Sequence, residues 1–364
     1  MNAKQNTIYK SLLKRLADGI YPYGVQIPFE RELAVEFHTN KMNAKRAVER
    51  LAVHGLVIRK RRKGTFAAEK LDRKLIRELM ESDENAVVVL HSAQPSNIHW
   101  HSGTFRALEE AVRPARCRLL YQTIPVNEAP AVFAGMMHSL ARLQPRALCV
   151  FFDNFELNFL YENSELFQCF KCPVIFLNRT GEPLRFENIV TVDIDHFSDG
   201  VRLGKLLAEK QCRHTLFFYP DVLKNCIWLK QRRDGITREL KKNGLPEPGT
   251  ETEYPRRFIR KHMPDAVIIA INNEIAAGLM DALAKEGIRA GRDYRLVTFD
   301  DSLPYRSYRM TSLFVPGEEI GSLIGEIICD SRLPRKYLPG LSLRVHSGLA
   351  VRETFSLQDQ YCSR

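Results

Sequence analysis

Five cations stand next to one another in the stretch Arg59-Lys60-Arg61-Arg62-Lys63, which ends on Gly64-Thr65-Phe66. Such a run is compatible with two kinds of chemistry. It can be a solvated charged segment, or it can neutralise the phosphates of a polyanion. The charge distribution along the rest of the chain favours the second.

The excess of positive charge lies in one part of the chain. Residues 1–77 hold 18 Lys and Arg against 7 Asp and Glu, whereas the other residues of the 364 carry equal numbers of both signs. A basic module beside a neutral one indicates a polyanionic partner, with nucleic acid favoured over a membrane surface. The length suits two or three folded domains.

Other chemistry is poorly supported by the sequence. Cys169 and Cys172 have the spacing of a redox or zinc pair, but no second pair completes four ligands. His91, His99 and His101 lie close together in sequence, again without a fourth ligand. Dinucleotide, phosphate-loop, nucleophile-elbow and zinc-protease motifs are missing. We therefore expect no metal, no cofactor and no enzymatic activity.

No apolar run is long enough to span a membrane, and the N-terminal residues are amphipathic rather than signal-like. These features predict a cytoplasmic protein with reduced cysteines.

The spacing of apolar residues predicts the elements that position the basic run. Helices are expected over residues 8–18, 29–37 and 41–53, and Asn40 is placed as the N-cap of the third. Short strands at residues 56–58 and 65–67 flank the cations. Three helices followed by a hairpin are typical of a winged helix-turn-helix, and the basic run is then the tip of the wing.

The segment IPFERELAVEFHTNKMNAKRAVERLAVHGLVIRKRRKGTF resembles the GntR-type winged helix throughout its length. The residues P-x-E-R-E-L-A, R-A-V-E-R-L and the closing G-T-F carry the resemblance. It implies that the third helix enters the major groove of DNA. The expected DNA-contacting residues are Arg31, Asn40, Lys41, Met42, Asn43, Lys45, Arg46, Arg61, Arg62, Lys63, Gly64 and Thr65.

Two departures from the family pattern have structural consequences. Phe29 stands where the family usually has Ser, so the second helix should lose a side-chain cap that contributes about 1 kcal/mol. Arg62 replaces a glycine that is common at the wing tip. For Arg50 we expect a solvated position or an ion pair with Glu49 or a neighbouring Asp.

Beyond the basic module the apolar period changes. Residues 67–83 predict a short linker helix, with Leu71, Leu75, Leu79 and Met80 at helical spacing and a partner chain as one possible packing surface. After Asn85, short apolar runs alternate with helical segments, which indicates parallel sheets covered by helices on both faces. The expected strands are 86–90, 147–152, 174–177, 189–192, 215–219, 266–271 and 296–299. The expected helices are 103–113, 130–143, 198–210, 230–243, 274–286 and 317–330.

This larger part resembles the effector domain of the LacI/GalR repressors, which is itself similar to periplasmic binding proteins. The matching segments are FSDGVRLGKLL, QRRDGITREL, AINNEIAAGLMDAL, LVTFDDS and LAVRETF, in that order. The whole chain then looks like an arabinose-repressor-type chimera. We expect an α/β protein with a winged helix-turn-helix at 1–68, a linker at 69–84, a two-lobed effector-binding and dimerisation domain at 85–356, and a tail at 357–364.

The resemblance also implies the residues that hold a small molecule between the lobes, beyond the carboxyl ends of the strands. These are Trp100, Asn178, Arg179, Trp228, Arg232, Tyr254, Asn272 and Asp300. Alternative interpretations stay open: Arg232 and Asp300 could simply pair across a cleft, and a tryptophan could belong to the core. For Asp193 and Asp195 we expect a strand end and a helix cap.

The sequence therefore predicts a homodimeric, DNA-binding transcription regulator, with a repressor favoured over an activator, that is controlled by a small-molecule effector. A carbohydrate is the first candidate for that effector, and a double-stranded operator is the expected DNA partner. A solute-binding protein without a transcriptional role is the alternative.

Overall fold

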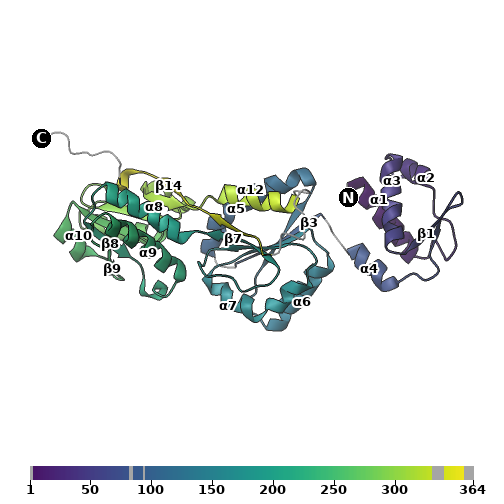
Figure 1. The fold of residues 1–364 in the computed structure, drawn as a ribbon, viewed down its shortest axis with the longest axis horizontal. Coiled ribbons are helices and arrows are strands. Elements are labelled where there is room, and N and C mark those ends of the chain that lie inside the picture. Colours follow the sequence, from purple (N-terminus) through teal and green to yellow (C-terminus); the bar gives the residue numbers. More distant parts are fainter. Residues whose placement is uncertain (1–2, 82–84, 93–94, 330–339, 356–364) are drawn as a thin grey trace.

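The computed structural model describes residues 3–81, 85–92, 95–329 and 340–355, and the side chains of residues 3, 81 and 95–100 fall outside that description. A small helical domain is followed along the chain by two lobes, each built around one sheet (Figure 1). Within these ranges, no helix has the length and apolar character needed to cross a membrane.

The N-terminal domain is the predicted winged helix. Its helices are α1 (Ala3–Ala17), α2 (Glu30–Glu36) and α3 (Lys41–Val53). The antiparallel strands β1 (Val57–Lys60) and β2 (Gly64–Ala67) form the wing. The core is made by the apolar face of α1 and by the face of α3 that the sequence predicted, with Ala44, Ala47, Val48 and Leu51 all buried.

The two helix starts behave as their sequences predict. The Asn40 side chain accepts a hydrogen bond from the Asn43 amide at 2.9 Å, which confirms it as the N-cap of α3. At α2 the side chain of Phe29 makes no cap hydrogen bond. The Glu32 carboxylate instead accepts the backbone N–H of Phe29 at 2.8 Å, so half of a capping box remains.

Helix α4 (Arg73–Glu81) packs on the domain that precedes it. Ile76 and Leu79 are buried in the core of the winged helix. Lys10 of α1 donates its Nζ protons to the carbonyls of Leu79 and Met80 at 2.6 and 2.7 Å. The segment that the sequence describes as a linker is thus attached to the winged-helix domain of its own chain.

Each lobe has a six-stranded sheet. The first lobe has the strand order β13-β7-β6-β5-β3-β4 and is parallel throughout. The second has the order β14-β12-β11-β10-β8-β9, in which only β14 runs antiparallel to its neighbour. The strands are β3 (Ala86–His91), β4 (Arg118–Thr123), β5 (Ala147–Phe151), β6 (Val174–Asn178), β7 (Ile189–Ile194), β8 (His214–Phe218), β9 (Gly249–Glu251), β10 (Ala266–Ala270), β11 (Arg295–Phe299), β12 (Thr311–Phe314), β13 (Ser342–Val345) and β14 (Gly348–Ala350).

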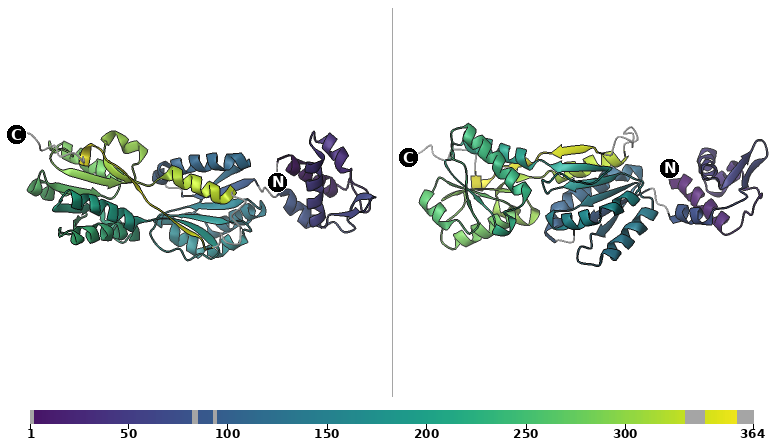
Figure 2. Two further views of the ribbon diagram at one scale, coloured as in Figure 1. Left: turned by 45° about the horizontal axis from the view of Figure 1, so that its top comes forward. Right: turned by 60° about the horizontal axis from the view of Figure 1, so that its bottom comes forward.

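Helices cover both faces of the two sheets (Figure 2). They are α5 (Pro95–Val112), α6 (Pro130–Arg142), α7 (Asn154–Glu162), α8 (His196–Glu209), α9 (Ile227–Lys242), α10 (Arg256–His262), α11 (Asn273–Ala284) and α12 (Gly317–Cys329). This is the doubly covered parallel architecture that the alternation of strands and helices predicts.

The chain passes between the lobes three times. It leaves the first lobe after β7 and enters the second with α8, whose leucines pack in the second core. It returns after β12, because α12 packs on α5 in the first lobe. It crosses again between β13 and β14 (Figure 2). Closing or opening the lobes must therefore bend three short segments together.

All seven predicted strands are present. The sequence missed β4, β9, β12, β13 and β14, together with α7 and α10. The missed strands are short or carry polar residues at alternate positions, as in Ser342–Val345, so they lack the continuous apolar runs of the central strands. Asp195 caps α8 as expected, whereas Asp193 bridges strands by accepting from Asn178 and Ser342.

Helices α8 and α9 approach so closely that only glycine fits at their contact. A Cβ added to Gly235 would overlap the carbonyl oxygen of Phe197 and lie 2.7 Å from the Val201 nitrogen. We predict that Gly235→Ala lowers the free energy of unfolding by about 1–3 kcal/mol, measured by urea denaturation. The matched control is Gly135→Ala in α6, where a Cβ meets nothing within 4 Å. The free energy of unfolding of the control should rise by about 0.5–1 kcal/mol. An equal change in the free energy of unfolding of both variants would contradict the packing argument.

Candidate functional site

A cavity of about 360 Å³ lies between the lobes at the carboxyl ends of the strands. Residues one or two positions after β5, β6, β7, β10, β11 and β12 contribute to its wall, so it occupies the position where open parallel sheets bind ligands. The wall consists of Asp153, Asn154, Phe155, Arg179, His196, Leu223, Cys226, Trp228, Arg232, Asn272, Asp300 and Val315.

Arg232 is the central cation of this wall. Helix α9 carries it, and only 4% of the residue is exposed. Its guanidinium carbon lies 4.1 Å from the ring centre of Phe299 and 5.1 Å from that of Trp228. Nη1 donates to the carbonyl of Ile271 at 3.4 Å, and Nη2 is 3.9 Å from Oδ1 of Asp300. The arginine is fixed by ring contacts, and its distance to the carboxylate exceeds a hydrogen bond.

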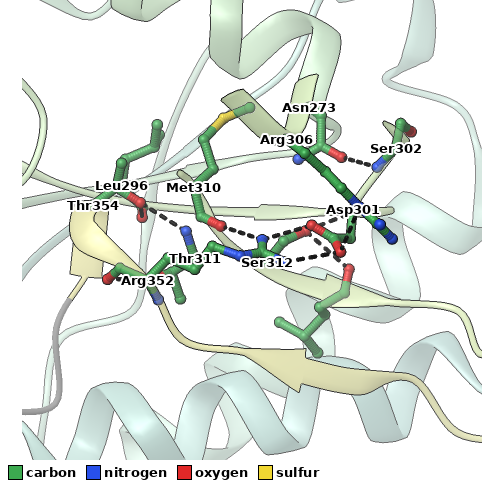
Figure 3. Close-up of polar contacts among 11 residues, drawn as sticks. Asn273, Leu296, Asp301, Ser302, Arg306, Met310, Thr311, Ser312, Arg352 and Thr354 are labelled. Carbon is green, nitrogen blue, oxygen red and sulfur yellow. Dashed lines mark hydrogen bonds and ion pairs between the residues drawn. The ribbon is translucent and has the colours of Figure 1, made fainter. Parts of the chain in front are cut away.

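The turn that carries Asp300 is fixed by hydrogen bonds between Arg352 and Asp301, the next residue in the chain (Figure 3). Both Asp300 and Asp301 have positive φ values, 88° and 49°, which is unusual for residues other than glycine. Arg352 binds Asp301 with two parallel hydrogen bonds of 2.6 and 2.9 Å, and it also donates to the carbonyl of Met310 at 2.8 Å. Because β14 leads directly into Arg352, the third crossing of the chain ends on the turn that carries Asp300.

Further hydrogen bonds fix the same turn. The backbone N–H of Asp300 donates to the carbonyl of Leu313 at 2.7 Å. The N–H of Ser302 donates to Oδ1 of Asn273 at 2.7 Å (Figure 3). The Asn273 side chain thus contacts the loop rather than the cavity. The Asp300 carboxylate is thereby preorganised on the cavity wall.

Arg179 supplies a second buried guanidinium. Burial lowers the pKa of Arg179 to about 10, an effect that the carboxylates of Asp300 and Asp153 oppose. Burial also lowers the pKa of Arg232, again against the influence of Asp300. A guanidinium group keeps its charge at neutral pH, and two aspartates, Asp153 and Asp300, lie on the same wall.

His196 is a neutral member of the wall. Its Nε2 lies 2.7 Å from the carbonyl oxygen of Arg179, and only 3% of the residue is exposed. Burial, together with the adjacent Arg232, holds the pKa of His196 well below its ordinary value. A carbonyl oxygen accepts only, so Nε2 carries the ring proton.

In the first lobe, Asp153 of the cavity wall is hydrogen-bonded to a buried carboxyl group, that of Glu156. Asp153 caps α7 by accepting the Phe155 amide at 2.9 Å. Glu156 accepts the backbone N–H of Asp153 at 3.1 Å and the hydroxyl of Ser92. Burial raises the pKa of Glu156 to about 7, and these hydrogen bonds counteract part of the shift.

The structure brings together five of the residues expected at an effector site: Arg179, Trp228, Arg232, Asn272 and Asp300. Asn272 has a second role, because its Oδ1 caps α11 by accepting the Ile275 amide at 2.8 Å. These five come from both lobes and face one cavity.

Two other expected residues, Asn178 and Tyr254, do not line this cavity. The Asn178 side chain forms hydrogen bonds with Thr180, Glu182 and Asp193. It borders a separate cavity of about 510 Å³. Tyr254 is 42% exposed and packs on Phe218. The side chain of Trp100 lies outside the described residues, as does the expected tail at 357–364.

Sequence reasoning did not single out Asp153, Asn154, Phe155, His196 or Cys226 as wall residues. A signal for the first two was present, because Asp153-Asn154 directly follows the apolar run of β5. His196 similarly comes two residues after β7. Cys226 precedes α9 and accepts a hydrogen bond from the Asn154 amide of the other lobe at 3.2 Å. Nothing in sequence spacing indicates that contact between lobes.

A further cavity of about 640 Å³ lies on the other side of the Asp300 turn, where Arg106, Asp301 and Arg306 contribute to its lining. Among the described side chains, no group of three or more His, Cys, Asp or Glu is arranged as a metal site. His101 stacks on Phe105, and the Nδ1 of His91 contacts the carbonyl of Ser92.

On the winged helix, the expected DNA-contacting side chains of α3 are mostly exposed. Lys41, Met42, Lys45 and Arg46 all face solvent, as Arg31 does on α2. Asn43 differs, because its side chain donates to Thr39 at 2.8 Å and accepts from Gln5 at 3.0 Å. Asn43 is therefore tied into the domain.

The wing tip exposes Arg61, Arg62 and Lys63. Arg62 has a φ of 61°, the left-handed conformation for which glycine is usual at this position, so the tip turns in spite of the substitution. Gly64 has a φ of 116°, and a Cβ there would lie 2.5 Å from the Gln26 amide. Thr65 is buried, which leaves its side chain without access to DNA.

Two cations near the wing serve the domain itself. Arg59 pairs with Glu30 at 2.8 Å and with Glu49 at 3.4 Å. The guanidinium carbon of Arg50 lies 4.3 Å from the ring centre of Tyr9, a cation–π contact within the domain.

Both parts of the chain match family models. Residues 4–67 match the bacterial regulatory proteins of the gntR family, and residues 205–354 match the periplasmic binding protein-like domain. Over 63 residues the chain is 40% identical to the HTH-type transcriptional regulator GmuR of Bacillus subtilis (strain 168). That match covers 17% of this chain and 27% of the relative, so it concerns the DNA-binding domain alone.

Solved structures match most of the chain in fold. The transcriptional regulator CelR in complex with cellobiose superposes with a TM-score of 0.56 at 15% identity, over 90% of this chain and all of that one. The lac repressor dimer bound to operator and the anti-inducer ONPF gives a TM-score of 0.57 at 13% identity, over 79% of this chain and 99% of that one. At these identities the likeness concerns the fold.

The pair of hydrogen bonds that fixes the Asp300 turn predicts a large effect at Arg352. Arg352→Met should lower the free energy of unfolding by about 2–3 kcal/mol, because it removes both short hydrogen bonds to the nearly buried Asp301 carboxylate. The matched control is Arg306→Met, since Arg306 is 59% exposed and lies 3.6 Å from the same carboxylate. It should change stability by less than about 1 kcal/mol in the same urea titrations. Similar losses of stability in both variants would show that the hydrogen bonds between Arg352 and Asp301 do not hold the turn.

The buried Glu156 predicts a pH dependence of stability. Because the native pKa of about 7 is raised above that of the unfolded chain, the stabilisation is present at low pH and is lost as pH rises through 7. Glu156→Gln should remove this loss. The free energy of unfolding of the variant, minus that of the wild type, should therefore increase from pH 5 to pH 8. Urea unfolding at both values measures it, with the exposed Glu110→Gln as control. A constant difference between wild type and variant would disprove the shift.

Proposed function

We propose that this chain, in which a gntR-family DNA-binding domain is joined to a periplasmic-binding-protein-like domain, is a transcription regulator whose operator affinity is controlled by a small molecule. A repressor is the form we favour, and a sugar is the effector class. One observation carries the proposal: an exposed basic helix and wing share a chain with a cavity between two lobes that presents buried arginines and carboxylates.

In the DNA-binding role, α3 enters the major groove, where Lys41 and Met42 at its start face base edges. Lys45 and Arg46, one turn later, are suited to phosphates or a guanine. The exposed cations of the wing follow the backbone or enter the adjacent minor groove. Two half-sites bound by a homodimer would set the operator's symmetry, which the dimeric, operator-bound lac repressor structure supports.

In the sensing role, the effector binds in the cleft between Arg179, Trp228, Arg232, Asn272 and Asp300. Planar polar groups suit hydroxyls, and the faces of aromatic rings suit the C–H surface of a sugar. The match to the cellobiose complex of CelR supports a carbohydrate. Phe155, 55% exposed on the other lobe, is positioned to cover such a ring.

Coupling between the two sites requires that the effector favours one arrangement of the lobes. The three crossings allow the lobes to rotate as units, and in a dimer such a rotation changes the spacing of the DNA-binding domains. Helix α4 packs on the winged helix and so carries that domain with it. The matched relatives are regulators, which supports action on DNA in the cytoplasm without catalysis.

The DNA-binding part of the proposal predicts a steep salt dependence. An operator is first selected from random duplexes, and its affinity is then measured against NaCl by fluorescence anisotropy. A dimer that neutralises about six to eight phosphates should give a slope of roughly −5 to −7 in log affinity against log salt.

Replacing the wing cations should flatten that slope. The triple variant Arg61→Ala, Arg62→Ala, Lys63→Ala should weaken binding to all sequences and reduce the slope by about 1 for each lost phosphate contact. The control is Lys241→Ala, Lys242→Ala, which removes exposed cations from the second lobe. If the wing variant bound DNA with wild-type affinity, or if the control lost as much affinity as the wing variant, the wing would not be the DNA-binding surface.

A further inference from the structure

Met42 stands at the second position of α3, the helix whose start is proposed to meet the bases of DNA. Its spacing to Lys45 and Arg46 places these three side chains on one face of the helix. That face is opposite the four buried residues of α3 that pack in the domain core. Met42 is 54% exposed. An exposed methionine is ordinary on a protein surface, so the residues beside it decide what it can do there.

The two asparagines beside Met42 are committed to the winged-helix domain. Oδ1 of Asn40 accepts the backbone N–H of Asn43 at 2.9 Å as the helix cap. The Asn43 side chain donates to Thr39 at 2.8 Å and accepts from the amide of Gln5, a buried residue of α1, at 3.0 Å. An asparagine reads adenine with its carbonyl and its amino group together. Asn43 would have to give up both of these contacts with the domain to do so.

Lys41 and Met42 are then the exposed side chains that the first turn of α3 offers to a base. The ammonium group of Lys41 donates hydrogen bonds, which suits the acceptors of a guanine. A thioether is no donor and only a weak acceptor, so Met42 can discriminate between bases by apolar contact alone. The apolar group that base pairs expose in the major groove is the C5 methyl group of thymine.

We propose that Met42 reads one thymine of each half-site through the C5 methyl group of that base, and that Asn43 positions α3 without reading a base. This inference rests on the proposed regulator function and narrows it to the chemistry of one contact. The unbranched, polarizable side chain of methionine adapts to the surface that it meets, which suits a contact without a hydrogen bond to direct it. At that position a 5-methylcytosine should therefore be accepted better than an unmodified cytosine.

The first test removes the methyl group from the DNA and leaves the protein unchanged. The full-length protein selects an operator from random duplexes. Each thymine of that operator is then replaced in turn by uracil, at both symmetry-related positions, which keeps every hydrogen-bonding group of the base. Burial of one methyl group is worth about fourfold in affinity, so the two replacements at the position read by Met42 should weaken binding by roughly tenfold. Replacement of the other thymines should have a much smaller effect.

Protein variants assign the effect to Met42. Met42→Ser removes the apolar contact and should bind the thymine and uracil operators equally. Met42→Leu keeps an apolar side chain and should still prefer thymine. Asn43→Ala should lower the affinity but select the same half-site, because a residue that positions the helix carries no base preference. The matched control is Met80→Ser, the same change on α4 at a side chain that is 38% exposed, and it should behave as the wild type does.

Each of the other results overturns the inference. Equal affinity of the wild type for thymine and uracil at every position would exclude a methyl contact, and the selected operator would leave the regulator function standing. A thymine preference that persists in Met42→Ser, or a changed half-site in Asn43→Ala, would assign the reading to another residue. Enrichment of no sequence from the random duplexes would overturn the regulator function and this inference together. The uracil replacements use the wild-type protein, so they decide the matter even where a variant does not fold.

Discussion

A guanidinium group buried in the wall of a cleft is the constraint on which this structure depends. Arg232 is nearly inaccessible to water, and its nearest carboxylate stands 3.9 Å away. An isolated buried charge is strongly unfavourable, so the surroundings must compensate for it. The burial of this charge is compensated in part by two aromatic faces, a carbonyl and the preorganised Asp300. The Nε of Arg232 still has no hydrogen-bond partner within the described structure, so a partner from outside the chain can bind it.

The architecture around the cleft follows from holding that group in place. Helix α9 can bring Arg232 to the wall because glycines let it lie against α8. Asp300 can face it because Arg352, at the end of the last crossing, fixes the neighbouring carboxylate. The segments that connect the lobes thus also position the charges between them. A ligand that completes the hydrogen bonding of Arg232 would act on the same hinge.

The sequence predicted the parts of this account that arise from local patterns. Continuous apolar runs such as Ala86–His91 identify buried parallel strands, and the cap at Asn40 follows from neighbouring residues. What it missed depends on distant partners. Strand β13 is stabilised by β7, about 150 residues earlier, and His196 has chemical meaning only beside the carbonyl of Arg179. For Tyr254 the resemblance suggested the cavity, but the chain turns the ring against Phe218.

A crystal structure of the protein grown with the sugar that binds best would test the central claim most directly. The account predicts sugar density in the 360 Å³ cavity, within hydrogen-bonding distance of Arg232 and Asp300, with the lobes closed around it. Density in the 640 Å³ cavity on the far side of the Asp300 turn, or at the protein surface, would contradict it. In that case Arg232 would stabilise the arrangement of the two lobes without binding the effector.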